Sequence, residues 1–237
     1  MFRSIFANIP DVTKNLLILN VLFFLAKMVF AGQGIDLDQK LGMHDPSSPY
    51  FEPYQIITHF FMHGDLFHLL FNMIGLVVIG SHLERVWGKK RYIIFYFITA
   101  LGAVLLHEAV HGYEIYKLTG ELFPTIRYGT FGADEMDLYA MNSQLQIHYL
   151  IPTVGASGAI YGLLAAFALL FPNTEFMLLF PPIPIKAKWL ALILAGIAIY
   201  SGYRNSGDSI AHFAHLGGMI FGFILVQIWK RKSDSFY

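Results

Sequence analysis

The chain has 237 residues, of which only 14% are charged while 56% are hydrophobic and 16% aromatic. Soluble domains carry about 25% charged residues, so this composition excludes an ordinary water-soluble domain and indicates a membrane protein. The formal net charge of zero favours no nucleic-acid partner. The absence of cysteine excludes disulfides, a thiol nucleophile and thiolate metal sites.

Six apolar stretches approach the length of about 20 residues that a membrane-spanning helix needs. They lie near residues 15–33, 66–84, 91–108, 157–172, 187–203 and 211–229. No small-residue cleavage site follows the first stretch, which favours a membrane helix over a removed signal peptide. The sequence therefore predicts one all-α domain over residues 1–237, a polytopic bundle of six transmembrane helices.

The basic residues are divided unevenly between the loops. With the N-terminus in the cytoplasm, eleven of the 16 lysine and arginine residues fall on the cytoplasmic side and four in the outer loops. Positive residues favour the cytoplasmic side, so we expect both termini there. We expect a bacterial plasma (inner) membrane, with membrane lipid as a partner. Two outer loops are long: 34–65, expected to lie in the membrane interface, and 109–150, which is acidic.

Polar side chains are expensive in membrane helices and usually mark function. The second predicted helix opens with His68 and Asn72, the fourth opens with Ser157, and the sixth contains His212 and His215. By the predicted topology, all of them lie near the outer ends of their helices. We therefore expect them to face one pocket that water can reach.

A serine and a histidine in one pocket can supply the nucleophile and the base for peptide-bond hydrolysis. Ser157 would lie at a helix N-terminus, among free backbone N–H groups. His215 can take its proton, with His212 one turn away as a competing base. His68 and Asn72 are four residues apart on one helix face, so both can donate hydrogen bonds to a developing oxyanion, together with the Ser157 N–H.

Small residues predict that the fourth and sixth helices touch. Each helix carries a small-xxx-small pattern, which lets two helix backbones approach closely. The pairs are Gly158 and Gly162 in the fourth helix, and Gly218 and Gly222 in the sixth. This contact would bring His215 to Ser157, and Tyr161, one turn after the serine, could pack against the imidazole. No acidic third residue is evident, so a dyad is predicted.

These residues resemble the motifs of the rhomboid family of intramembrane serine proteases. The matching stretches are His68-Leu69-Leu70-Phe71-Asn72, Gly155-Ala156-Ser157-Gly158 with Tyr161, Ala214-His215-Leu216-Gly217-Gly218 with Gly222, and the pair Glu84-Arg85. The resemblance covers residues 50–230. It implies a six-helix core with the serine on the fourth helix and the histidine on the sixth. The first outer loop departs from the family because it lacks a Trp-Arg pair, and the 109–150 connection is unusually long.

The resemblance also assigns roles. Ser157 would be the nucleophile and His215, rather than His212, the general base. His68 and Asn72 would form the oxyanion site, supported by Gly155 and the Ser157 N–H. Substrates would be single-span membrane proteins cut near the outer surface, and no cofactor is implied.

Other interpretations compete with this one. The Gly155–Gly158 segment could serve helix packing alone, and a rhomboid-like protein could bind membrane clients without cutting them. A transporter would need broken helices near the bilayer centre and repeated halves, and the sequence shows neither.

One motif points to a zinc-dependent membrane protease. His107-Glu108-Ala109-Val110-His111 matches the H-E-x-x-H pattern, which places two histidines on one helix face. The motif lies where the third predicted span ends, and no other span offers an aspartate as a further ligand. We therefore predict no metal site, and catalysis by His107, Glu108 and His111 is the less favoured alternative.

Overall fold

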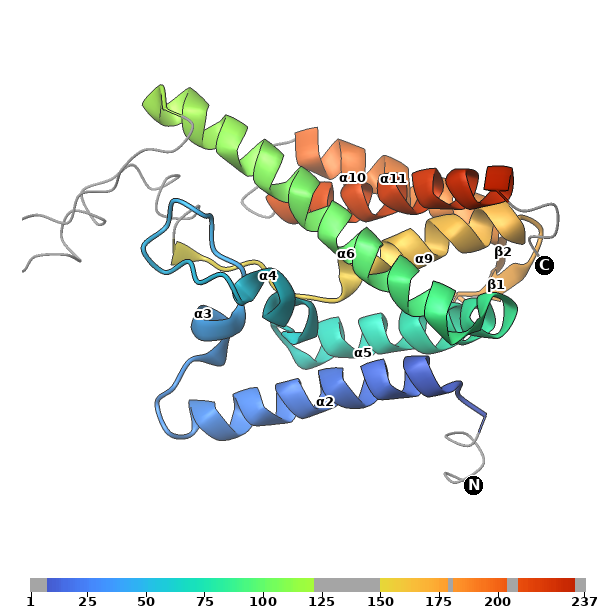
Figure 1. The fold of residues 1–237 in the computed structure, drawn as a ribbon, viewed down its shortest axis with the longest axis horizontal. Helices are drawn as coiled ribbons and strands as arrows, with labels where there is room; N and C mark the ends of the chain where they lie inside the picture. The colour runs from blue at the N-terminus through green and yellow to red at the C-terminus, as the bar shows by residue number, and fades with distance from the viewer. Residues whose placement is uncertain (1–7, 122–149, 179–180, 204–208, 233–237) are drawn as a thin grey trace, which may run out of the picture.

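In a computed structural model, residues 8–121, 150–178, 181–203 and 209–232 are described, and they are mainly helical, which confirms the predicted class. The long helices and their π-helical connection are α2 (Asp11–Ala31), α5 (Leu66–Gly75), η2 (Leu76–Gly80), α6 (Ser81–Thr119), α9 (Ser157–Leu170), α10 (Ala187–Tyr203) and α11 (Ser209–Lys232). Figure 1 shows α2 along one edge of the bundle and α10 with α11 at the opposite edge.

One glycine divides the longest helical region in two. Helix α5, the π-helical turn η2 and α6 follow one another without interruption, but Gly88 has φ 74° and ψ 165°. Glycine adopts such a positive φ without the clash of a Cβ atom. The chain turns back at this end of the bundle (Figure 1). The part of α6 that follows Gly88 continues to Thr119, beyond residue 108, where the predicted span ended. Gly120, in the left-handed conformation, ends this helix.

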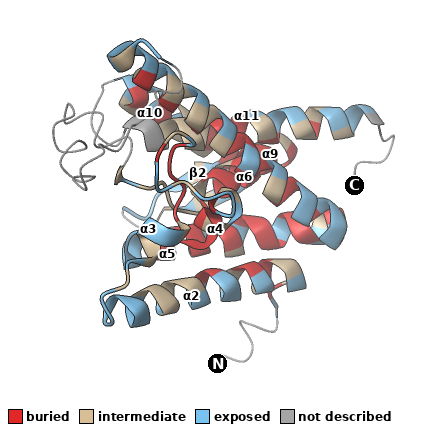
Figure 2. Ribbon diagram, turned by 60° about the vertical axis from the view of Figure 1, so that its left-hand side comes forward, coloured by how far each residue is buried: buried red, intermediate tan, exposed pale blue. Residues whose placement is uncertain are grey.

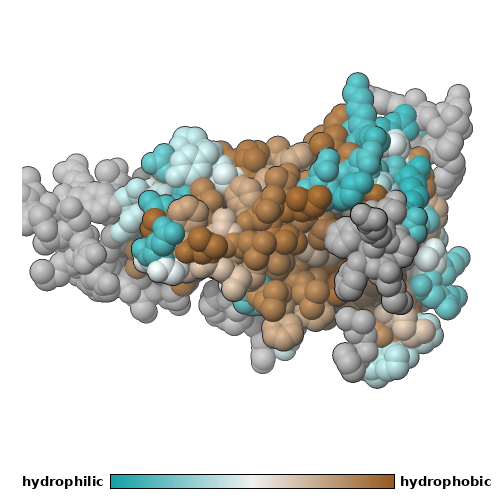
Figure 3. All heavy atoms as spheres, turned by 90° about the horizontal axis from the view of Figure 1, so that it is seen from below, coloured by the Kyte–Doolittle hydropathy of each residue, from teal (hydrophilic) through white to brown (hydrophobic). Residues whose placement is uncertain are grey.

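The helices are apolar enough for an integral membrane protein. Among the residues that the structure describes, three helical regions are long and apolar enough to cross a membrane: Asp11–Ala31, His212–Arg231 and Leu66–Thr119, the region that Gly88 divides. Helices α9 and α10 are apolar but shorter. A space-filling view from the side of α2 shows an apolar band with hydrophilic residues at both ends (Figure 3). Six membrane crossings stay a prediction.

Helices α6, α9 and α11 pack at very short range. A Cβ atom added to Gly222 would lie 2.7 Å from the Gly162 carbonyl oxygen, and one added to Gly218 would overlap the carbonyl of Gly158. A Cβ atom on Gly162 would in turn meet Thr99 of α6 at 2.5 Å. The glycines of α11 therefore face the backbone of α9, while those of α9 face α6. Buried residues gather in this region (Figure 2).

The first outer segment folds as short helical turns. They are α3 (Leu37–Leu41), α4 (Gln55–Thr58) and the 3-10 turn η1 (His59–Phe61). Gln55 is buried, accepts a hydrogen bond from the His44 N–H at 3.3 Å and donates one to the Tyr50 carbonyl at 2.9 Å. Buried polar side chains of this segment thus form hydrogen bonds with its backbone N–H and carbonyl groups.

The bundle contains one short strand pair that the sequence analysis did not predict. Strands β1 (Glu175–Met177) and β2 (Pro184–Lys186) form an antiparallel pair between α9 and α10, with Phe176 opposite Ile185. Pro172 lies just after α9, and the short segment that returns to α10 pairs with itself. Of the acidic 109–150 connection, residues 122–149, including Asp134, Glu135 and Asp137, lie outside the described residues.

Candidate active site

Ser157 is the first residue of α9, and the segment in front of it is held by the first outer segment. Thr153 pairs with Met43 through two backbone hydrogen bonds of 2.8 and 2.9 Å. The Gly155 N–H donates to the His59 carbonyl at 2.9 Å. Gly155 has φ 130°, a conformation that L side chains rarely adopt, which explains a glycine here. These contacts fix the turn that presents Ser157.

The structure brings Ser157 and His215 together. The His215 Nε2 atom lies 2.8 Å from Ser157 Oγ, within hydrogen-bond distance. The Tyr161 ring stacks on the imidazole with centroids 4.2 Å apart and planes 1° apart. Among the described residues, His215 Nδ1 has no hydrogen-bond partner. The imidazole is therefore oriented by an aromatic ring rather than by a carboxylate.

His212 lies beside this pair without joining it. Its ring centroid is 6.1 Å from that of His215, and the planes are nearly perpendicular. The contact with the Ser157 hydroxyl is made by His215. Of the two candidate bases, His215 therefore has the geometry for proton transfer.

His68 reaches the serine from α5. The Gly64 N–H faces His68 Nδ1 at 3.4 Å, which makes Nδ1 the acceptor and places the ring proton on Nε2. A Cβ atom added to Gly155 would lie 2.9 Å from His68 Nε2 and 3.6 Å from Ser157 Oγ. The glycine therefore leaves room for an N–H donor beside the nucleophile.

Asn72 is placed differently. It is buried one turn after His68, and its Nδ2 donates to the His68 carbonyl at 2.9 Å. It is not among the residues that line the cavity around Ser157. In this structure the side chain braces the helix turn that carries His68.

A cavity of about 140 Å³ connects these groups. Its polar lining consists of His59, His68, His107, Thr153, Ser157 and His215, and apolar residues such as Phe60 and Val104 form the rest. Sequence reasoning did not place His59 and Thr153 in the site because they lie outside the predicted membrane helices, in the short turn η1 and in the segment before α9. His107 carried a signal, the H-E-x-x-H pattern, but was assigned to another chemistry.

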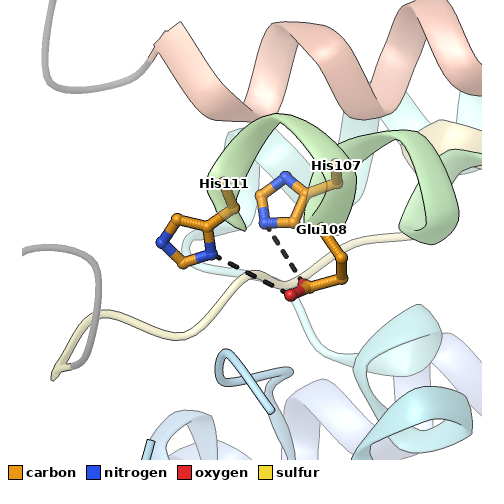
Figure 4. Close-up of side chains that lie close together, drawn as sticks. All are labelled: His107, Glu108 and His111. Atoms are coloured by element: carbon orange, nitrogen blue, oxygen red, sulfur yellow. Dashed lines mark ion pairs between the residues drawn. The ribbon is translucent and has the colours of Figure 1, made fainter. Parts of the chain in front are cut away.

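The H-E-x-x-H residues form a second cluster on α6. His107 Nε2 lies 3.7 Å from Glu108 Oε1, and His111 Nδ1 lies 4.0 Å from Glu108 Oε2 (Figure 4). Both imidazoles are buried. The ligand atoms of the three residues lie within 4.8 Å of one another, so they could hold a metal ion. Asp45 adds a second carboxylate, 3.5 Å from His111 Nδ1.

Comparison with known proteins agrees with the motifs. The sequence matches the Rhomboid domain family over residues 50–232. Rhomboid protease AarA of Providencia stuartii is 27% identical over 69% of this chain and 51% of its own length. The Putative rhomboid protease YdcA of Bacillus subtilis is 27% identical over 78% of this chain and 72% of its own length.

A plant relative gives a similar result. Rhomboid-like protein 19 of Arabidopsis thaliana is 24% identical over 77% of this chain and 50% of its own length. The chain spans about half the length of several relatives that it matches. Since the family match covers most of the sequence and includes both the serine and the histidine, the chain belongs to the rhomboid family.

Proposed function

We propose that this protein is an intramembrane serine endopeptidase that uses Ser157 and His215 as a catalytic dyad. The observation that carries the proposal is the 2.8 Å contact between His215 Nε2 and Ser157 Oγ, beside a polar cavity. Proteases among the similar rhomboid proteins support the same reaction class. No cofactor takes part in this mechanism.

The proposed reaction is acyl transfer through Ser157. His215 Nε2 takes the hydroxyl proton while Oγ attacks the carbonyl carbon of the scissile peptide bond. The C–N bond then breaks, and His215 returns the proton to the leaving amine. Water, deprotonated by the same imidazole, hydrolyses the acyl-serine and restores both residues. The stack with Tyr161 keeps the ring plane aligned in both half-reactions.

The oxyanion of the tetrahedral intermediate needs hydrogen-bond donors that are already in place. The Ser157 N–H and the His68 Nε2–H are the proposed donors. We predicted Asn72 as a third donor. We propose instead that its hydrogen bond to the His68 carbonyl holds the helix turn that carries His68. The second hydrogen of its amide group is then available to a bound substrate. Removing one donor typically lowers kcat by about 100- to 1000-fold.

The proposed substrates are single-span membrane proteins cut near the outer surface. This placement rests on the predicted topology, in which six helices cross the bilayer and both termini lie in the cytoplasm. A bacterial inner membrane is the predicted location. Relatives named as mitochondrial and chloroplastic show that the family match does not choose among membranes.

The proposal is tested with purified protein in liposomes that contain a single-span reporter. We expect wild type to cut and Ser157→Ala to leave no measurable turnover. The matched control Ser81→Ala, which removes a buried hydroxyl from α6, should retain activity. A fluorophosphonate probe should label wild type and not Ser157→Ala.

The same experiment distinguishes the alternatives. Cleavage by Ser157→Ala would rule out the serine mechanism. Loss of cutting in a zinc chelator together with active Ser157→Ala would identify the His107–His111 motif as the catalyst. Capture of the reporter without cleavage or probe labelling by wild type would identify a client-binding protein.

A further inference from the structure

The geometry points to a metal site that is separate from the proteolytic dyad. We propose that His107, Glu108 and His111 of α6 and Asp45 of the first outer segment bind one divalent transition-metal ion of the zinc class. The ion would hold the first outer segment against α6, next to the cavity that contains Ser157.

Position on the helix supplies the first argument. His107 and His111 are four residues apart, so α6 presents them on one face, and Glu108 lies between them in sequence. Figure 4 shows the carboxylate of Glu108 reaching toward a nitrogen of each imidazole. Helix α6 continues past this motif to Thr119, so these positions are fixed by regular helical backbone.

The distances between the ligand atoms supply the second argument. Zinc binds histidine nitrogen and carboxylate oxygen at about 2.0–2.2 Å, so neighbouring ligands of a tetrahedral ion are about 3.3–3.6 Å apart. The separations found are 3.5 Å for Asp45 to His111, 3.7 Å for Glu108 to His107 and 4.0 Å for Glu108 to His111. The ligand atoms of His107, Glu108 and His111 all lie within 4.8 Å of one another, and Asp45 faces this group through His111, so an ion would draw the four side chains closer together.

Asp45 is already oriented for the role. Its Oδ1 atom accepts hydrogen bonds from the Ser47 N–H, at 2.7 Å, and from the Ser47 hydroxyl. The other oxygen, Oδ2, is the one that faces His111. Asp45 is 5% exposed, so its carboxylate is removed from bulk water. Such second-shell hydrogen bonds orient metal ligands and strengthen binding.

Burial of the carboxylates favours a cation. The two Glu108 oxygens are buried and accept no hydrogen bond from the described residues, although each faces an imidazole nitrogen. A second carboxylate, from Asp45, lies nearby. A buried carboxylate is costly in its charged form, and an ion with a charge of +2 would stabilise that form in Glu108. The two imidazoles select zinc-like ions over magnesium or calcium, which prefer oxygen ligands.

The number of protein ligands indicates a structural site rather than a catalytic one. Catalytic zinc keeps three protein ligands and an open position for water, whereas structural zinc has four. Here Glu108 and Asp45 complete the set with the two histidines, so Glu108 binds the ion instead of acting as a base. On metal binding, His107 Nε2 exchanges its 2.9 Å contact with the Thr153 hydroxyl for the ion.

The test measures metal binding and does not depend on proteolysis. Protein stripped with a chelator is titrated with Zn²⁺ by calorimetry, and Co²⁺ reports coordination by its visible absorption. We expect one ion per chain, a tetrahedral Co²⁺ spectrum and a higher thermal unfolding midpoint with Zn²⁺. Glu108→Gln and His111→Ala should each weaken binding by at least about 100-fold, because loss of a ligand exceeds the loss of a second-shell contact.

Matched variants complete the design. His82→Gln removes a histidine of α6 that makes edge-to-face contacts with Phe167 and Phe171 and is not part of the cluster, so this variant should bind as wild type does. Ser157→Ala should also bind normally, which separates this proposal from the proteolytic one. Asp45→Asn keeps the shape of the loop and should lose affinity even if the α6 variants fold poorly.

Equal affinity in wild type and Asp45→Asn, or an octahedral Co²⁺ spectrum, would overturn the four-ligand site. Full Zn²⁺ affinity in Glu108→Gln would show that Glu108 is not a ligand and would overturn the structural assignment.

Discussion

Helix α2 and the trio of α6, α9 and α11 are attached to the same bundle by different means. The trio meets backbone to backbone, through Gly218 against Gly158 and Gly222 against Gly162. Helix α2 buries only Thr13, Leu16 and Asn20, and its remaining apolar side chains are partly or fully exposed. Lipid is as apolar as leucine, so exposed apolar surface does not hold a membrane helix to its neighbours.

Polar contacts at both ends attach α2 instead. At its N-terminal end, the buried Glu84 carboxylate of α6 accepts hydrogen bonds from backbone N–H groups of α2. Nearer its C-terminal end, Lys27 donates to the carbonyls of His63 and Gly64 at 2.8 and 2.7 Å, and pairs with Asp38. The comparison teaches that the core around Ser157 and His215 depends on shape, whereas the position of α2 depends on charge and hydrogen bonds.

The largest effect on stability and labelling is expected where α11 packs closely against the backbone of α9. Gly218→Leu places a side chain on the Gly158 carbonyl, which is backbone and cannot move aside. We expect the unfolding free energy to fall by at least about 3 kcal/mol and probe labelling of Ser157 to disappear. Gly196→Leu is the matched control, because an added Cβ atom on this glycine of α10 meets nothing within 4 Å. Equal loss in both variants would show that close packing is not what assembles the site.

The difference between the two regions also explains what the sequence could predict. Local patterns located the six helical segments, and the order of the motifs placed Ser157 and His215 on the fourth and sixth. The contact between Asp45 and His111 could not be predicted, because it joins a loop to a helix distant in sequence. The β1–β2 pair was missed for a similar reason, since its strands are three residues long and show no extended alternation.

The candidate site shows the same division. Helical spacing placed Tyr161 on the face of Ser157, and the structure stacks it on His215. Spacing also placed Asn72 on the face of His68, but it could not tell that the amide would turn back to the His68 carbonyl. Hydrogen bonds within one helix turn compete with hydrogen bonds to groups in a pocket, and the spacing of residues does not tell which of the two is more stable.

An intermediate effect is expected from acid, at the attachment near the C-terminal end of α2. His63 is fully buried beside Lys27 and His68, and burial lowers the pKa of its imidazole from 6.5 to about 4. The folded state therefore keeps His63 neutral, while the unfolded chain binds a proton below pH 6.5. The contribution of neutral His63 to the free energy of unfolding is complete above pH 6.5 and is lost as the pH falls through 4. The total loss is on the order of 3 kcal/mol.

Thermal unfolding midpoints between pH 7.5 and 4.5 measure this loss. We expect the midpoint of wild type to fall more steeply with acid than that of His63→Gln, which cannot take up the proton. Burial also lowers the pKa of His59 to about 4. His59 is present in both proteins, so its effect cancels when their pH profiles are compared. Parallel pH profiles would show that His63 titrates alike in the folded and unfolded states.

The smallest effect is expected at the attachment of the N-terminal end of α2. Glu84 Oε2 accepts hydrogen bonds from the Thr13 N–H and hydroxyl at 2.7 and 2.8 Å, and Oε1 accepts one from the Val12 N–H at 3.0 Å. Glu84→Gln keeps the shape but removes the charge and turns an NH₂ group toward one of these donors. We expect a local cost of about 1–3 kcal/mol in the docking of α2, with the catalytic core unaffected.

Thiol labelling reports this docking directly, because the chain has no cysteine of its own. Leu16→Cys introduces a thiol at a position of α2 that is 4% exposed. Its labelling rate should rise about tenfold for each 1.4 kcal/mol that Glu84→Gln removes. Glu175→Gln, on the exposed strand β1, is the charge-matched control and should leave the rate unchanged. An unchanged rate in Glu84→Gln would mean that the few buried apolar contacts of α2 suffice to hold it. The distinction between a core assembled by shape and a helix attached by charge would then fail.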